Sequence, residues 1–143
     1  MCPAHSYVTP FAFVLNDDTR ILAVDDDPIM REFASVYLST HMASVETAAT
    51  AEVGLRKLER GDFDIALVDL EMPGMGGMEM IRHIRADRRL CGLPVVVVTG
   101  HDDIISIDRS YEAGATSFVT KPINWRLLSY QIRYVLRAQR VLA

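Results

Sequence analysis

The sequence predicts an α/β domain with a doubly wound, five-stranded parallel sheet that is covered by helices on both faces. Apolar segments of strand length alternate five times with segments whose apolar residues have helical spacing. This alternation is typical of a parallel sheet with crossover helices. Several strand segments are almost continuously apolar, as expected for strands that are buried on both faces. The length of 143 residues suits one domain with a core of its own.

The regular part of the chain is expected to begin after residue 18, with a buried strand at residues 20–24. Asp27 and Pro28 then form a helix-start signal, because Asp is a favoured N-cap and Pro suits the first helical position. The helix is predicted to end near residue 40, and its apolar residues recur on one side. These residues are Ile29, Met30, Phe33, Val36, Tyr37 and Leu38.

Residues 43–48 alternate weakly between apolar and polar side chains, as an edge strand does. Thr50 is predicted to cap the following helix, and Gly61 is predicted to end it. The inner side of this helix is predicted to carry Ala51, Leu55 and Leu58.

The central strand is predicted at residues 65–69, where an apolar run leads to the carboxylate of Asp69. The glycine-rich segment that follows, residues 70–77, is predicted to be a loop. A helix is expected over residues 77–86. Its core side is predicted to carry Met78, Ile81, Ile84 and Arg85.

Residues 93–99 form the clearest predicted strand, and Pro94 is tolerated there because it falls at the start. A helix over residues 104–113 is expected to follow, with Gly114 closing it. The fifth strand is predicted at residues 116–120.

The last helix, predicted over residues 123–142, is longer than the roughly 11-residue average. Two sets of its residues recur every seven positions: Leu127, Tyr134 and Val141, and Leu128, Val135 and Leu142. This spacing favours a helix that continues into a linker or pairs with a second copy of the chain. The alternative is an ordinary capping helix with a frayed end.

The composition is that of an ordinary globular protein, because half of the residues are hydrophobic and 24% are charged. The net charge of −4 argues against direct nucleic-acid binding, which needs a basic patch. No stretch approaches the ~20 apolar residues that cross a membrane. Cys2 and Cys91 have no paired spacing, so we expect no disulfide framework, and a reduced, cytoplasmic setting.

Residues 1–18 are expected to form an N-terminal tail ahead of one domain at residues 19–143. The apolar run at residues 11–15 follows no basic region and is too short for a signal-peptide core. We therefore expect a flexible or loosely docked tail. The alternative is that Phe11 and Phe13 pack on a partner or on a second copy.

Polar side chains follow four of the predicted strands at the points where the strands end. They are Asp25, Asp26, Asp69, Thr99 and Lys121. Because ligands bind outside the carboxyl ends of the strands in α/β sheets, we expect these side chains to lie together at a binding site. Each alone has a structural explanation, such as helix capping by Asp26 or solvation of Lys121. Their common edge favours a functional site.

Three neighbouring carboxylates repel one another, and one takes up a proton unless a cation intervenes. A hard divalent cation with oxygen ligands, Mg²⁺ or Mn²⁺, removes this conflict. Together with the ammonium group of Lys121 and the hydroxyl of Thr99, such an ion makes a receptor for a phosphoryl group. Asp69 is then predicted to be the nucleophile that accepts this group as an acyl phosphate.

Four stretches of the chain resemble the motifs of the response-regulator receiver domain, the CheY-like domain of bacterial two-component systems. They are residues 24–28 (VDDDP), 68–75 (VDLEMPGM), 98–100 (VTG) and 121–122 (KP), in the order that the family has. The resemblance covers roughly residues 20–140. It implies a flavodoxin-like (βα)5 sandwich with the strand order 2-1-3-4-5.

The resemblance implies that Asp69 takes a phosphoryl group from a histidine kinase or a phosphotransfer protein. It also implies that Mg²⁺ is held by the carboxylates of Asp25, Asp26 and Asp69 and by the main-chain carbonyl of Glu71. The domain then catalyses only its own phosphorylation and slow dephosphorylation.

The same resemblance makes Thr99 the switch hydroxyl and pairs Lys121 with the phosphoryl group. The peptide bond between Lys121 and Pro122 is typically cis in this family, which an X-Pro bond adopts at modest cost. Phosphorylation is expected to change the face formed by the fourth helix, the fifth strand and the last helix. That face, or the last helix alone, would control an output domain, a partner protein or a homodimer.

The chain departs from the family pattern at two places. Phe118 stands where the switch aromatic is often tyrosine, so its coupling to Thr99 lacks a hydroxyl. Gly76 and Gly77 stand where an Asp-Gly pair is common, which is expected to loosen the start of the third helix.

Glu71 and His101 lie two residues beyond Asp69 and Thr99, at positions that in this family tune the lifetime of the phosphoryl group. The alternative for His101 is a solvent-facing loop residue. An unchanged rate of dephosphorylation in a His101→Ala variant would contradict the tuning role.

Two other functions use similar residues. A receiver-like interaction module that is never phosphorylated usually lacks one of the acidic or lysine positions, and all are present here. A small aspartyl-phosphate phosphohydrolase would need Glu71 as its general acid and a cap domain. Within the receiver family, residues 113–138 look most like receivers that precede cyclic-di-GMP domains, which are diguanylate cyclases or phosphodiesterases.

Overall fold

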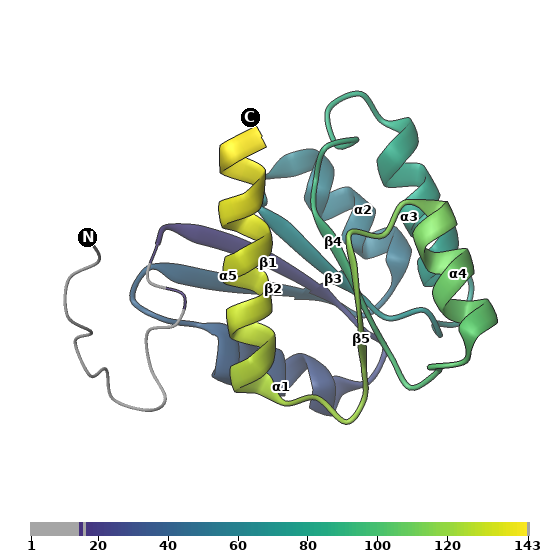
Figure 1. Ribbon diagram of the computed structural model, residues 1–143, viewed down its shortest axis with the longest axis horizontal. Helices are drawn as coiled ribbons and strands as arrows, with labels where there is room; N and C mark the ends of the chain where they lie inside the picture. Colours follow the sequence, from purple (N-terminus) through teal and green to yellow (C-terminus); the bar gives the residue numbers. More distant parts are fainter. Residues whose placement is uncertain (1–14, 16, 143) are drawn as a thin grey trace.

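The structure is an α/β sandwich whose five parallel strands have the order β2-β1-β3-β4-β5, which confirms the predicted fold class (Figure 1). The computed structural model describes residue 15 and residues 17–142, with side chains described up to residue 139. The strands are β1 (Thr19–Val24), β2 (Ala43–Ala48), β3 (Ile65–Val68), β4 (Val95–Thr99) and β5 (Ser117–Thr120). The helices are α1 (Pro28–Leu38), α2 (Ala51–Arg60), α3 (Gly77–Ala86), α4 (Ile104–Ala113) and α5 (Trp125–Leu142).

The sheet has a hydrophobic core on each face. Helices α1 and α5 cover one face, and α2, α3 and α4 cover the other (Figure 1). In β1, Leu22 and Val24 belong to the core under α2 and α3, whereas Ile21 and Ala23 belong to the core under α1 and α5. The continuous apolar runs in the sequence therefore mark strands that bury both sets of side chains.

The strand register aligns the ends of the strands that carry the polar residues. Val24 of β1 is the partner of Val68 of β3, and the N–H of Asp69 donates to the carbonyl of Val24 at 3.0 Å. Thr99 of β4 pairs with Thr120 of β5, and the N–H of Lys121 donates to the carbonyl of Thr99 at 2.8 Å. The residues that follow these strands consequently leave the sheet at the same edge.

Helix α1 begins as predicted, with Pro28 as its first residue and the Asp27 side chain accepting from the N–H of Ile29. The predicted apolar stripe is only partly correct, because the inward face is made by Ala34 and Leu38. Four members of the stripe are exposed: Ile29 (61%), Phe33 (41%), Val36 (59%) and Tyr37 (49%). The apolar surface of α1 is wider than the part that contacts the sheet.

Part of this surplus apolar surface packs against the start of α5 instead. The ring of Tyr37 stacks on Trp125 with centroids 5.7 Å apart, and Phe33 meets Trp125 edge-on at 6.4 Å. Aromatic rings favour these arrangements beyond the area they bury. The contact joins α1 to α5 along the margin of their shared face.

Helices α2 and α3 follow the predicted boundaries. Thr50 caps α2 by accepting from the N–H of Val53, and Gly61 ends it. In α3, Ile81 and Ile84 are buried as predicted, but the third large core residue is Met80 and not Met78, which is half-buried. Arg85, the residue after Ile84, was predicted on the core side and is half-buried.

The guanidinium of Arg85 joins α3 to two loops. It donates to the carbonyls of Gly114 at 2.8 Å, Cys91 at 3.1 Å and Leu93 at 2.5 Å. Gly114 has a φ of 117°, the left-handed conformation that glycine adopts at the end of a helix. Arg85 therefore fixes the end of α4 against α3.

Helix α5 packs on the sheet through Leu128, Ile132 and Leu136, all of which are buried. Its contact with the domain extends to Gln139, which donates to the carbonyl of Gly92 at 2.7 Å. Of the seven-residue repeats, Leu128 is fully buried, whereas Leu127 (52%) and Tyr134 (74%) are exposed. The exposed repeat is therefore available for a contact beyond the sheet.

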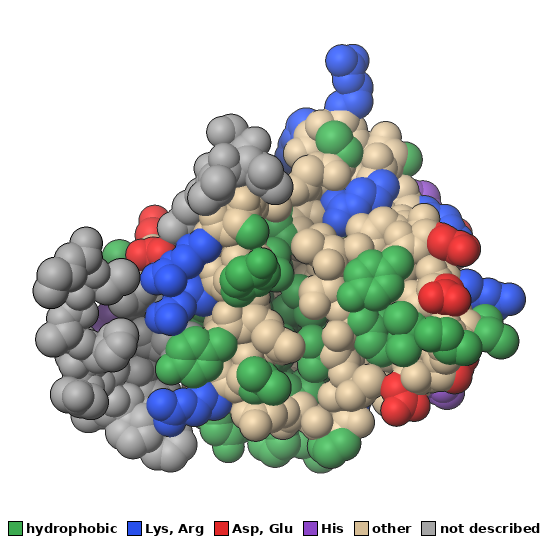
Figure 2. All heavy atoms as spheres, viewed as in Figure 1, with side chains coloured by type: hydrophobic (Ala, Val, Ile, Leu, Met, Phe, Trp, Pro, Cys, Tyr) green, Lys and Arg blue, Asp and Glu red, His purple; other side chains and the backbone are tan. Residues whose placement is uncertain are grey.

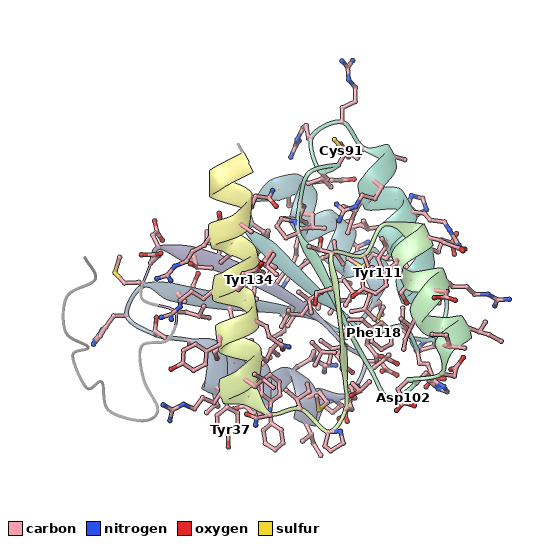
Figure 3. The ribbon with its side chains drawn as sticks, viewed as in Figure 1. Tyr37, Cys91, Asp102, Tyr111, Phe118 and Tyr134 are labelled. Carbon is pink, nitrogen blue, oxygen red and sulfur yellow. The ribbon has the colours of Figure 1, made fainter. Side chains whose placement is uncertain are left out.

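Most of the predicted tail lies outside the described residues, including Phe11, Phe13 and Cys2. Within the described part, Leu15 is buried, and its carbonyl accepts a hydrogen bond from the hydroxyl of Thr40. Cys91 is an exposed free thiol (Figure 3). No helix in the described part of the chain has the length and apolar character needed to cross a membrane.

Gly77, the first residue of α3, is required by the backbone below it. A Cβ at this position would lie 2.2 Å from the carbonyl oxygen of Asp69 and 2.8 Å from the Cα of Leu70. Neither backbone atom can move without shifting the end of β3. We therefore expect Gly77→Ala to lower the free energy of unfolding by about 2 kcal/mol or more, measured by urea denaturation.

Gly76→Ser is the matched control, because a Cβ at Gly76 has no neighbour closer than 3.5 Å. Gly76 is the N-cap of α3, where it provides no side-chain hydrogen bond and serine is favoured. The control should be neutral or slightly stabilising. A Gly77→Ala variant as stable as the Gly76→Ser variant would contradict the prediction.

Candidate functional site

Three carboxylates gather at the carboxyl end of the sheet. Oxygen atoms of Asp25, Asp26 and Asp69 all lie within 4.8 Å of one another. Asp25 and Asp69 are buried, at 8% and 6% exposure, whereas Asp26 is exposed. They line an open cleft of about 650 Å³ that the loops after β1, β3, β4 and β5 enclose.

Lys121 is the cation of this cluster. Its ammonium group lies 3.0 Å from an oxygen of Asp25 and 3.4 Å from an oxygen of Asp69. It comes from the end of β5 and reaches across β4 to the ends of β1 and β3. One ammonium group thus bridges the two buried carboxylates.

The remaining carboxylate oxygens accept backbone hydrogen bonds. An oxygen of Asp25 accepts from the N–H of Asp27 at 2.9 Å, and an oxygen of Asp69 accepts from the N–H of Glu71 at 3.2 Å. Both bonds reach two residues along the chain, the Asx-turn pattern. The loops after β1 and β3 therefore hold their own carboxylates in place.

The pKa values of Asp69 and Lys121 are both raised, for different reasons. Burial raises the pKa of Asp69 and the charge of Asp25 adds to this rise, while Lys121 and the Glu71 N–H oppose it. Burial alone would lower the pKa of Lys121, but the contacts with Asp25 and Asp69 outweigh it and the pKa is raised. The contacts with Lys121 therefore do not cancel the effects of burial and of the neighbouring Asp25 charge on Asp69.

Thr99 lies at the end of β4 and is fully buried. Its hydroxyl oxygen accepts a hydrogen bond from the N–H of His101 at 3.3 Å. The structure therefore brings all five residues predicted at the strand ends to one edge, with Thr99 beneath the loop that starts at Gly100.

Glu71 and His101, each predicted to be a tuning residue, contact each other through His101 Nε2 and Glu71 Oε1. Both side chains are exposed. Their loops follow β3 and β4, so the pair connects two sides of the cleft edge. The two side chains therefore contact each other while both remain exposed to solvent.

Phe118 of β5 is half-buried and packs against the core under α3 and α4. Figure 3 shows it on the same side of the molecule as Tyr111 of α4. The peptide bond between Lys121 and Pro122 is cis, as the family resemblance implies.

The sequence pattern did not indicate one residue that contacts the site. The guanidinium of Arg31, on the first turn of α1, donates to the carbonyl oxygen of Asp25 at 2.9 Å. No spacing rule identifies a side chain that binds a backbone carbonyl. The only signal in the sequence is a basic residue one turn into the helix that follows the acidic loop.

Comparisons with known proteins agree with this geometry. The family model described as the response regulator receiver domain matches residues 21–133. A crystal structure of a CheY-like receiver domain protein from Methanospirillum hungatei is 34% identical, covers 87% of this chain and 98% of its own, and has a TM-score of 0.81. The chemotaxis protein CheY4 of Vibrio cholerae is 29% identical over 82% of this chain and 98% of its own, with a TM-score of 0.78.

Two curated relatives are longer proteins. A cyclic di-GMP phosphodiesterase of Thermotoga maritima is 38% identical over 117 residues, which is 82% of this chain and 31% of that protein. The heme response regulator HssR of Staphylococcus aureus is 32% identical over 122 residues, which is 85% of this chain and 53% of that protein. The chain thus spans from about a third to about half of the length of these relatives.

The raised pKa of Asp69 predicts how stability changes when its charge is removed. In the absence of divalent cations, Asp69→Asn should raise the free energy of unfolding near neutral pH, because it removes a buried charge that repels Asp25. Folding raises the pKa of Asp69, so the cost of its charge is complete only above the folded pKa. The gain should therefore shrink as the pH falls through the folded pKa and vanish below the unfolded value of about 3.9.

Urea denaturation in the presence of a chelator, at neutral and acidic pH, measures this difference. Asp108→Asn removes an exposed carboxylate of α4 and serves as the control, for which we expect little change at either pH. A loss of stability in Asp69→Asn at neutral pH would show that the charge of Asp69 is favourable in the fold.

Proposed function

This chain belongs to the receiver-domain family of response regulators, and we propose that Asp69 is the residue that accepts a phosphoryl group in this domain. The observation that carries the proposal is the cluster of three carboxylates, two of which, Asp25 and Asp69, are bridged by Lys121. We infer that the donor is a histidine kinase or a phosphotransfer protein of a two-component system, as is usual in this family.

In the proposed reaction, an oxygen of the ionised Asp69 carboxylate attacks the phosphorus atom of a phosphohistidine. The new O–P bond forms as the N–P bond breaks, and the departing imidazole nitrogen keeps the electron pair. Phosphoryl transfer requires mainly alignment and balance of charge. Burial and the N–H of Glu71 hold the Asp69 carboxylate still, while Lys121 is placed to pair with the phosphoryl oxygens.

The donor set also fits a hard divalent cation, because it consists of carboxylate oxygens at the edge of an open cleft. We propose that Asp25, Asp26, Asp69 and the carbonyl of Glu71 hold Mg²⁺ or Mn²⁺. When bound, the ion would supply positive charge against these carboxylates and the incoming phosphoryl group. Asp26 suits this role because it faces the cleft, whereas Asp25 is bonded to Lys121.

Thr99 and Phe118 are the proposed switch. The hydroxyl of Thr99 would leave the N–H of His101 to bind the phosphoryl group, and Phe118 would change its burial in response. Phe118 has no hydroxyl, so its part in the switch would depend on packing alone. The pairing of Glu71 with His101 at the cleft edge supports their proposed tuning role, which His101→Ala would test through the rate of dephosphorylation.

The complete set of site residues favours a phosphoacceptor over a receiver-like module that only binds partners. We propose that the domain catalyses no reaction beyond its own phosphorylation and slow dephosphorylation. The similarity to a longer phosphodiesterase supports the proposal that an output domain follows the last helix in such proteins.

We propose that phosphorylation acts on the α4-β5-α5 face. Figure 3 shows Tyr111 of α4, Phe118 of β5 and Tyr134 of α5 on this side of the molecule. Exposed apolar residues lie on α4 and on α5: Ile104, Ile105, Tyr111, Leu127, Tyr130 and Tyr134. Exposed apolar patches are typical of interaction sites.

The charges on this face differ between the two helices. Helix α5 contains four arginines and no Asp or Glu. Helix α4 exposes two acids, Asp108 and Glu112, and one base, Arg109, and it follows the exposed Asp102 and Asp103, so this side is acidic on balance. Figure 2 shows basic side chains beside α5, and acidic side chains together with basic ones around α4. In a two-fold symmetric pair, α4 of one copy would meet α5 of the other with opposite charges. This complementarity supports a homodimer as the active state.

Phosphorylation of Asp69 is tested with acetyl phosphate and Mg²⁺. We expect the intact mass to increase by one phosphoryl group, and we expect Asp69→Asn to abolish the increase because the amide is not a nucleophile. Asp102→Asn, which removes an exposed carboxylate in the β4–α4 loop, is the control and should be labelled like the wild type. Labelling of the Asp69→Asn variant to the wild-type extent would refute the assignment.

Dimerisation is tested by sedimentation equilibrium with and without beryllofluoride, a phosphoryl mimic. We expect beryllofluoride to produce dimers in the wild type, and Tyr134→Asp to weaken them at least about 10-fold, since it places a charge in an apolar contact opposite the acidic α4. Met42→Asp, at an exposed position in the α1–β2 loop, is the control and should still dimerise. A wild-type monomer under both conditions would contradict the dimer.

A further inference from the structure

We propose that Arg31 is a positioning residue for Asp26, and that it acts through the backbone of the loop between β1 and α1. The inference rests on the proposed metal-dependent function of the acidic cluster. It begins from the one side chain of α1 that contacts the backbone of this cluster, through the 2.9 Å hydrogen bond from Arg31 Nη1 to the carbonyl of Asp25.

Every polar group of Asp25 makes a hydrogen bond. Its N–H donates to the carbonyl of Ala48 at 3.1 Å, and its two carboxylate oxygens accept from the Asp27 N–H and from Lys121. Its carbonyl is held by Arg31 alone among the described residues. Within the described part of the chain, Arg31 is thus the one group that hydrogen-bonds to the peptide group joining Asp25 to Asp26.

Asp26 has no comparable support of its own. Its exposed carboxylate makes no hydrogen bond or ion pair with any residue that the structure describes. The direction of its side chain therefore depends on its backbone. That backbone is held between two contacts: the preceding carbonyl binds Arg31, and the following N–H, of Asp27, binds Asp25.

The contact also requires the shape of arginine. Arg31 is half-buried, and it lines a small cavity of about 20 Å³ together with Asp25, Asp69 and Trp125. The planar guanidinium group of arginine can donate one N–H to a carbonyl in a fixed direction while its other N–H groups remain solvated. The ammonium group of lysine is a compact charge at the end of a flexible and shorter side chain, so it does not reproduce this direction. Lysine at this position would preserve the charge but not the geometry of the bond.

Replacing a residue that orients a metal ligand through hydrogen bonds typically lowers the metal affinity by about 10–100-fold. We therefore expect Arg31→Met and Arg31→Lys each to weaken Mg²⁺ binding about 10-fold, measured by titration of the fluorescence of Trp125, the single tryptophan. Saturating Mg²⁺ should restore the labelling rate with acetyl phosphate to within about 2-fold of the wild type, since the loss is one of ligand orientation. Arg56→Met, which removes an exposed arginine of α2, is the matched control and should bind Mg²⁺ like the wild type.

The backbone amide resonance of Asp26 gives a second readout that does not depend on activity. In the metal-free protein it should shift or broaden in both Arg31 variants and stay unchanged in Arg56→Met. Wild-type Mg²⁺ affinity in Arg31→Met would overturn the inference, and so would wild-type affinity in Arg31→Lys, because charge alone would then explain the effect. If the wild type itself neither bound Mg²⁺ nor was labelled, the proposed function would fail before the role of Arg31 was in question.

Discussion

The structure depends on holding two mutually repelling carboxylates side by side in a buried position. The register of β1 and β3 requires this, because Val24 and Val68 are partners and Asp25 and Asp69 are the next residues. Burial reduces the screening of charge, so both the repulsion between these carboxylates and their attraction to a cation are stronger than in water. Lys121 arrives from the opposite side of β4 and bridges both carboxylates. The strand order β1-β3-β4-β5 is therefore what places a positive group against the acidic pair.

The loops around this cluster are tight on the buried side and open on the side of the cleft. On the buried side, Gly77 lies so close to the carbonyl of Asp69 that no side chain fits between them. On the open side, Asp26, Glu71 and His101 are all exposed. A site of this form can hold the buried Asp69 carboxylate rigidly while it admits a partner from solvent. The same contrast explains why glycine at residue 77 supports the site, a constraint that the expected loosening of the helix start by the Gly76-Gly77 pair did not include.

The fold and the convergence of the site were predictable because both follow from simple patterns. Strand runs that end in polar residues determine which side chains meet at the sheet edge, whatever the details of packing. The inner face of α1 was not predictable in the same way. Apolar spacing identifies a helix, but the depth at which the helix lies against the sheet decides which residues are buried. Ala34 and Leu38 make the contact, while Phe33 and Tyr37 reach Trp125 on another helix. The bond from Arg31 to a backbone carbonyl follows no spacing rule, and its only signal in the sequence is a basic residue in the first turn of the helix after the acidic loop.

The path from the site to the α4-β5-α5 face is short enough to need no extended network. Thr99 and Thr120 are register partners, and the carbonyl of Thr99 accepts from the N–H of Lys121, so the end of β4 cannot move without β5. The hydroxyl of Thr99 is engaged by the N–H of His101, only two residues before the N-cap of α4 at Asp103. Release of that hydroxyl toward a phosphoryl group would remove one support of the loop that starts α4. A local change of charge would thus act directly on a neighbouring helix, which is sufficient for a two-state element.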